Sequence, residues 1–225
     1  MYHNGYMAAL ATGDPWYIVA NLISQADCCQ SLGRHIIAIQ ALEEALRVVG
    51  KPDDVASVRS KAHLLTCWAD NAMMLGDYRN TQEKLDAAEA YLDQFDPSEE
   101  FDRAAWLLIA GKYALNTKNY IKAKDCFEQA LVELPEQWTL RRTMTATGLA
   151  MAYARMKERD CTIAIAESLT SLVQFTDAPM TNRWFAEYLR QDLLEGFSAD
   201  THVRTFVADT YQKFPALAAL PHPKR

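Results

Sequence analysis

The segment 105–135, AWLLIAGKYALNTKNYIKAKDCFEQALVELP, limits what this chain can fold into more than any other stretch. Its apolar residues recur with a helical period on both sides of a short polar turn at Lys118-Asn119. Small residues, which let two helix backbones approach closely, alternate with bulky ones that fill the remaining space. They are Gly111, Ala114, Ala123 and Ala130, set among Leu107, Tyr120, Phe127 and Leu131. The segment therefore predicts an antiparallel pair of amphipathic helices.

The same pattern recurs along the chain about every 40 residues, which indicates a repeat architecture. When four helix pairs are aligned, a small residue precedes each turn, at Ala26, Ala69, Gly111 and Ala150. Three further columns run through the second helices: Ala38, Thr81, Ala123 and Thr162; Leu42, Leu85, Phe127 and Ala166; Ala45, Ala88, Ala130 and Leu169. We expect a fifth, less regular pair near the C-terminus, because a terminal repeat must cover the apolar face of its neighbour.

The spacing Leu107-x2-Ala110-Gly111, then Ala123-x3-Phe127, then Pro135, resembles a tetratricopeptide repeat (TPR), a helix–turn–helix unit of about 34 residues. The intervals are longer here because several first helices have an extra turn. The resemblance implies an all-α fold, a right-handed superhelical array of about five antiparallel helix pairs. We assign this array to residues 14–214, with 1–13 as the remnant of a preceding helix or a tag, and 215–225 as a flexible tail.

Capping residues and prolines predict where the helices begin. The expected starts are Asp14-Pro15, Asp53, Asp96-Pro97, Pro135-Glu136, Ala178-Pro179 and Asp200. Glycines and short polar pairs predict where the helices end, at Gly33, Gly50, Gly76 and near Lys157-Glu158. No strand signal interrupts the series.

Longer stretches, such as ATGDPWYIVANLISQADCCQSLGR and RTMTATGLAMAYARMKERDCTIAIAESLTSLV, resemble the C-terminal TPR region of bacterial regulators that carry an N-terminal helix-turn-helix domain. The start, MYHNGYMAALATGD, reads as the last turns of a helix whose beginning is missing, so we expect an excised fragment. No helix-turn-helix precedes residue 14, which in a complete chain would put a DNA-binding role in doubt. The resemblance implies a sensing, ligand-binding or dimerising module that does not itself contact nucleic acid. The alternative is a structural scaffold, such as the sensor arm of a larger signalling ATPase.

Composition and motifs narrow the function classes. The net charge of −6 disfavours nucleic acid or an anionic membrane as a partner. Five cysteines without a CxxC pair indicate a reducing compartment, and no apolar run approaches the roughly 20 residues of a membrane-spanning helix, so we expect a cytoplasmic protein. No catalytic or phosphate-binding motif is present, so we expect no enzyme activity and no cofactor. His63, Cys67 and Asp70 share a helical face but lack a fourth ligand, so we expect no metal.

A concave groove is the expected binding site, because the first helix of each TPR pair lines the inner face. Positions flanking the small column give the candidate residues: Asp27, Gln30, Thr66, Asp70, Met73, Leu108, Lys112, Leu115, Asn116, Met151 and Arg155. An extended peptide would place its positive end near the early carboxylates and its acidic end near the later basic residues. The alternative, equally open, is that these are ordinary solvated positions with methionines filling the inner curve.

The C-terminal helices carry more aromatic and branched residues than capping one repeat requires. These are Trp184, Phe185, Tyr188, Val203, Phe206, Val207 and Tyr211. We therefore expect part of this surface to meet a second copy of the chain in a homodimer.

Overall fold

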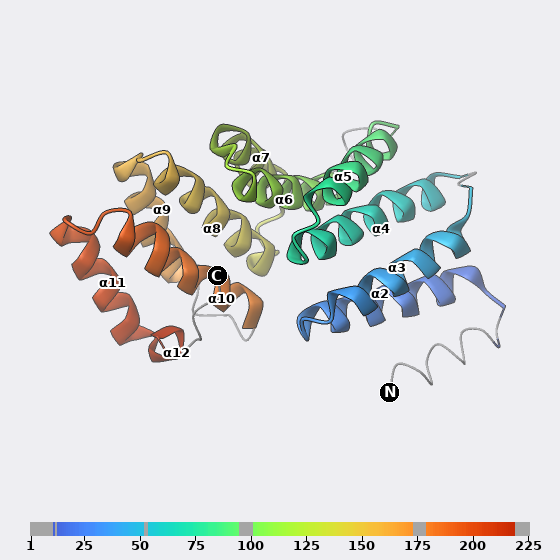
Figure 1. Ribbon diagram of the computed structural model, residues 1–225, viewed down its shortest axis with the longest axis horizontal. Helices are drawn as coiled ribbons and strands as arrows, with labels where there is room; N and C mark the ends of the chain where they lie inside the picture. The colour runs from blue at the N-terminus through green and yellow to red at the C-terminus, as the bar shows by residue number, and fades with distance from the viewer. Residues whose placement is uncertain (1–10, 12, 52–53, 95–100, 173–178, 219–225) are drawn as a thin grey trace. The chain divides into compact units, whose positions relative to one another are not determined.

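The computed structural model describes residues 11, 13–51, 54–94, 101–172 and 179–218, and every regular element in those ranges is helical (Figure 1). In chain order the elements are α2 (Pro15–Ser31), α3 (His35–Val49), α4 (Val55–Met74), α5 (Tyr78–Leu92), α6 (Phe101–Asn116), α7 (Tyr120–Glu133), α8 (Thr139–Arg155), α9 (Arg159–Leu172), α10 (Pro179–Glu187), the π-helix η2 (Tyr188–Glu195), α11 (Thr201–Lys213) and α12 (Pro215–Ala218). None of the described helices combines the length and apolar character needed to cross a membrane.

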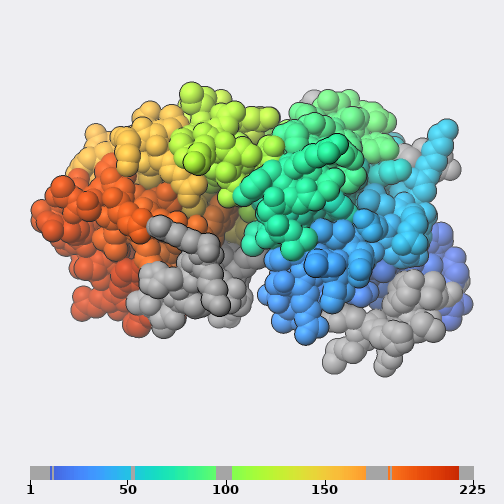
Figure 2. Space-filling model, in the orientation of Figure 1, coloured from blue at the N-terminus to red at the C-terminus, as the bar shows by residue number. Residues whose placement is uncertain are grey.

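The chain divides into two compact units, residues 1–109 and 110–225, and the boundary falls within α6. In unit 1, α2 packs against α3, α3 against α4, and α4 against α5 (Figure 1). In unit 2, α8 packs between α7 and α9, and also contacts α10 and η2. The space-filling view shows the gold atoms of α9 next to the orange and red atoms of the C-terminal helices (Figure 2).

The aligned columns of the repeat are all interior. Each residue of the four columns is buried, including Ala38, Thr81, Ala123 and Thr162, which have no exposed surface. Small side chains at these positions let neighbouring helices approach closely, as the pattern predicted. In unit 1 the core continues into Val19, Leu22, Leu64 and Trp68.

Four short turns join helices within pairs by the same geometry. Gly33 and Gly76 adopt the left-handed backbone conformation, with φ of 72° and 77°. Lys118 and Lys157 occupy the equivalent places with φ of 64° and 65°, although a side chain makes this conformation costly. The same turn geometry is thus reached with glycine in unit 1 and with lysine in unit 2.

Phe127 of α7 fills a slot between two glycines in unit 2. A Cβ built on Gly111 of α6 would lie 2.6 Å from Phe127 Cε1, and one built on Gly148 of α8 would overlap the tip of the same ring. The Phe127 side chain is fully buried. Glycine at both positions therefore makes room for a ring between α6 and α8.

Helix α8 is enclosed over most of its length, and residues 145–152 are all buried. Its threonine hydroxyls bond within the helix: Thr143 Oγ1 donates to the Thr139 carbonyl at 2.7 Å, and Thr147 Oγ1 to the Thr143 carbonyl at 2.8 Å. These hydroxyls therefore need no partner from neighbouring helices, and α8 can be surrounded by packed side chains.

Three predicted helix starts change or fall outside the described residues. The N-cap of α4 is Asp54, whose carboxylate accepts from Ser57 N at 2.7 Å, so the predicted Asp53 cap was wrong by one position. Helix α8 begins at Thr139, because Pro135 starts a turn in which Trp138 N donates to the Pro135 carbonyl at 3.1 Å. Asp96-Pro97 lies outside the described residues. Asp14 and Asp200 cap α2 and α11 as predicted.

The C-terminal region of unit 2 holds its aromatic residues inside the chain. Phe185, Tyr188, Val203 and Val207 are buried, and Trp184, Phe206 and Tyr211 are half-buried. Residues 215–218, within the predicted tail, form α12 and bury Leu217.

Candidate functional site

The candidate residues of unit 1 lie on α2, α4 and α6. The Gln30 amide of α2 donates to Asp70 Oδ2 of α4 at 2.6 Å, which joins two candidate residues across neighbouring helices. Asp27 is exposed, whereas Asp70 is 8% exposed. Three further candidate residues, Thr66, Met73 and Leu108, are buried. Among the candidate residues of this unit, Asp27 and Gln30 are therefore the polar ones with the most exposed surface, and Gln30 is bonded to Asp70.

The candidate residues of unit 2 lie on α6 and α8. Lys112 is buried, and its Nζ lies 5.7 Å from the centre of the Trp184 ring on α10. Leu115 and Met151 are buried as well, while Asn116 is exposed. An ammonium over the face of a tryptophan is attracted by the ring electrons. Trp184 therefore covers Lys112 from within the same unit.

Arg155 at the end of α8 already binds a carboxylate of its own chain. Arg155 Nε donates to Asp192 Oδ1 at 2.8 Å, and Arg155 Nη2 lies 3.5 Å from Asp192 Oδ2. Burial alone would lower the pKa of Arg155, but the hydrogen bond and charge of Asp192 raise it above its ordinary value. Burial raises the pKa of Asp192, and Arg155 opposes that shift. An acidic ligand at Arg155 would have to compete with Asp192.

Glu187, at the end of α10, adds a second carboxylate to this region. Burial raises the pKa of Glu187, the charge of Arg155 lowers it in part, and the charge of Asp192 raises it further. Both carboxylates thus lie in the field of Arg155, with a further contribution from Arg190 at Glu187 and from Lys157 at Asp192. Sequence patterns did not reveal this arrangement, because Asp192 follows Arg155 by a whole helix pair and lies in the irregular π-helix η2.

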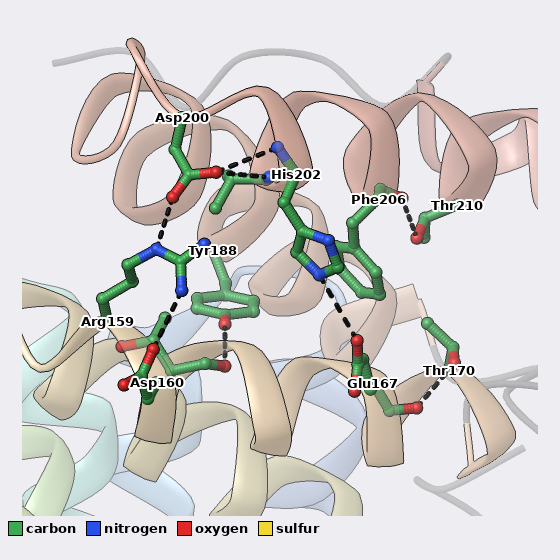
Figure 3. A network of polar contacts seen from close by, with 11 residues as sticks. Arg159, Asp160, Glu167, Thr170, Tyr188, Asp200, His202, Phe206 and Thr210 are labelled. Atoms are coloured by element: carbon green, nitrogen blue, oxygen red, sulfur yellow. Dashed lines mark hydrogen bonds and ion pairs between the residues drawn. The ribbon is translucent and has the colours of Figure 1, made fainter.

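A second polar network of unit 2 joins α9 to α11 (Figure 3). Arg159 forms ion pairs with Asp200 and, at 2.8 Å, with Asp160. The hydrogen bond from Arg159 is the main reason that the pKa of Asp200 falls to about 2, and the backbone N–H of Val203 lowers it further. His202 Nε2 lies 3.5 Å from Glu167 Oε1, a pair that is ionic only when the imidazole is protonated.

This network forms the walls of a groove of about 410 Å³. The groove is lined by Arg159, Asp160, Ile163, Ala164, Glu167 and His202. The α9 wall is held from below, where the Tyr188 hydroxyl of η2 donates to the Thr162 carbonyl at 3.2 Å. The groove was not among the sequence candidates, because its residues fall on the second helices of the last two pairs rather than on the first.

Two of the three candidate zinc ligands contact each other, and the third is bonded elsewhere. Cys67 Sγ lies 3.6 Å from His63 Nε2, whereas Asp70 accepts from Gln30. Among the residues that the structure describes, no group of three or more histidine, cysteine or acidic side chains is placed to hold a metal ion.

Comparison with known proteins identifies the fold. No protein-family model matches the sequence, and no curated protein matches it. BtubC (BKLC) from P. vanneervenii has a TM-score of 0.72 and 15% identity over 100% of this chain and 92% of that one. A Podosopora anserina protein described as a kinesin light chain with nearly identical TPR-like repeats has a TM-score of 0.63 and 14% identity, over 90% and 97%. The chain is therefore an all-α, TPR-like solenoid of antiparallel helix pairs. The relation to bacterial transcriptional regulators stays a prediction.

Proposed function

We propose that this chain is a non-catalytic protein-interaction module that binds a protein or peptide through the inner residues of its helix pairs. The observation that carries the proposal is the repeat itself. Both units consist of consecutive antiparallel pairs, and solved chains of the same architecture match nearly the whole length. Stacked helix pairs present extended surfaces rather than enclosed pockets, and such surfaces suit protein partners.

Unit 1 offers a place for a positively charged group of the ligand. Asp27 is exposed, and the Gln30 amide donates to the Asp70 carboxylate. A hydrogen bond to a charged, partly buried group contributes about 1.5–3 kcal/mol. A lysine or arginine side chain that reaches Asp70 would therefore dominate recognition in this unit.

Unit 2 would recognise an acidic group of the ligand mainly through Asn116, because Trp184 covers the buried Lys112. Asn116 is exposed at the end of α6, so its amide can bond a peptide backbone. Arg155 contributes only where a ligand carboxylate competes with Asp192. We expect Asn116 to matter more for binding than Arg155.

The finer role that we propose is the sensor or dimerisation domain of a bacterial transcriptional regulator, on the resemblance of its repeats. The alternative is a scaffold or the sensor arm of a signalling ATPase. A helix-turn-helix encoded upstream of this segment would support the first role, and a P-loop would support the second. A homodimer through the C-terminal helices also stays a proposal, and sedimentation equilibrium of the purified chain tests it.

The proposal is tested with a random peptide library selected on the immobilised 225-residue chain. Enriched peptides are synthesised and titrated against wild type and Asp70→Asn, which removes the charge but keeps an oxygen to accept from Gln30. We expect the enriched peptides to carry lysine or arginine. We expect Asp70→Asn to weaken their binding about tenfold to a hundredfold.

The matched control is Asp86→Asn, which makes the same charge change at an exposed position of α5. This control should bind the peptides with an affinity within about twofold of the wild-type value. Equal affinities for wild type and Asp70→Asn would remove this face of unit 1 from the binding site. A library without any enriched sequence would count against peptide binding altogether.

A further inference from the structure

We propose that the groove between α9 and α11 docks a basic amphipathic helix of a partner protein. This surface is separate from the inner residues considered above, and the proposal stands whether or not those residues bind a ligand. The floor of the groove is apolar: Ile163 is half-buried and Ala164, with its small side chain, is exposed. A leucine side chain of the partner would lie over Ala164.

The groove is held open by contacts at both of its ends. The Arg159–Asp200 ion pair joins α9 to α11 at one end, and His202 meets Glu167 at the other (Figure 3). Val203 and Val207 bury the opposite side of α11. Because both walls are fixed within unit 2, a partner would find a preformed surface and would lose little free energy to reorganisation.

The charge of the groove selects a basic partner. Arg159 is the single arginine among three carboxylates, those of Asp160, Asp200 and Glu167. The Asp160 side chain is 92% exposed and that of Glu167 is 56% exposed, so both present oxygens to solvent. The whole chain also carries a net charge of −6, which speeds encounters with a basic partner.

The spacing of these groups matches a helix. Asp160 and Glu167 lie seven positions apart on α9, which places them on one face about 10.5 Å apart. The apolar floor residues Ile163 and Ala164 lie midway between them. A partner helix laid along α9 with lysines seven residues apart and a leucine between would satisfy both carboxylates and cover the floor.

The test uses the full chain and two synthetic helical peptides of identical composition. In the first, lysines at positions i and i+7 flank leucine at i+3 or i+4. In the second, the lysines are moved to the opposite face. We expect the first peptide to bind more tightly, and Asp160→Asn/Glu167→Gln to weaken it about twofold to thirtyfold, since two exposed ion pairs are lost. Binding should weaken as salt is added.

Two further variants separate this proposal from a general charge effect. Glu83→Gln/Asp86→Asn removes the same charge from exposed positions of α5 and should leave affinity unchanged. Ala164→Trp fills the groove at an exposed position and should abolish binding while circular dichroism is retained. Equal binding of the two peptides, equal binding to wild type and Asp160→Asn/Glu167→Gln, or no binding would overturn the proposal. The proposal would also be overturned if the wild-type chain self-associates and Asp160→Asn/Glu167→Gln does not, because the groove would then bind a second copy of the chain.

Discussion

Gly111→Ala is the substitution that tests the packing of unit 2 most directly. In an ordinary helix this change adds about 0.8–1 kcal/mol to the free energy of unfolding, because alanine has the higher helix propensity. Here the new methyl group would lie 2.6 Å from Phe127 Cε1, well inside van der Waals contact. The fully buried ring cannot move into solvent. The substitution should therefore destabilise.

The expected magnitude follows from two opposing effects. Overpacking a core costs about 1–3 kcal/mol, and the helix-propensity gain offsets about 1 kcal/mol of it. The net loss for Gly111→Ala is then about 0–2 kcal/mol, and Gly148→Ala should lose at least as much, since its methyl would overlap the ring tip. Phe127→Ala alone should cost about 3–5 kcal/mol, as expected for a large cavity.

The double variant Gly111→Ala/Phe127→Ala decides whether the ring is the cause. Without the ring, the added methyl meets no obstacle and fills part of the cavity, so alanine at 111 should then raise stability by about 1 kcal/mol. Urea unfolding followed by circular dichroism at 222 nm gives the four free energies. Ala208→Gly, at an exposed site of α11, measures how much helix propensity alone changes the free energy of unfolding. If Gly111→Ala stabilises the wild-type chain, the slot for Phe127 does not exist as described.

Other consequences of the structure can be measured with the same unfolding assay. Asp192→Ala should cost about 1.5–3 kcal/mol, because it removes the carboxylate that accepts a hydrogen bond from Arg155 inside unit 2, and a loss below about 1 kcal/mol would contradict that pairing. Glu187 has a raised pKa, so its contribution to stability is present at low pH and is lost as the pH rises through its folded pKa. Glu187→Gln should therefore gain stability relative to wild type as the pH rises above about 4, and a difference that does not change with pH would refute the assignment. Lys118→Gly should raise the free energy of unfolding by about 0.5–1 kcal/mol by relieving the left-handed backbone, as a thermal melt would show.

The repeat could be predicted from sequence because its interior is local. Each column position, such as Ala123 or Ala130, is set by the helix crossing within one pair, and that crossing leaves a small residue in a fixed place of the sequence. Every column that the alignment gave is therefore interior. The shift at Asp54 reflects a choice between adjacent aspartates, and the later start of α8 reflects the turn at Pro135.

The binding residues were harder to predict because they depend on contacts from outside their own pair. The environment of Lys112 includes Trp184, and that of Arg155 includes Asp192, each from a later helix that has no repeat partner in the alignment. Periodicity can place a side chain on the inner side of a helix, but it does not say what covers it. The groove at Ala164 could not be predicted for a related reason. Its walls come from α9 and α11, and α11 matches the repeat columns poorly.

The enclosed helix α8 has a consequence for how unit 2 opens. Its backbone amides over residues 145–152 are shielded by side chains on all sides, and its threonine hydroxyls are bonded inside the helix rather than to neighbours. Local fluctuations of α9 or α11 therefore need not break a polar contact to α8 hydroxyls. In heavy water, the amide protons of α8 should be the slowest in unit 2 to exchange for deuterium, with protection close to that of global unfolding.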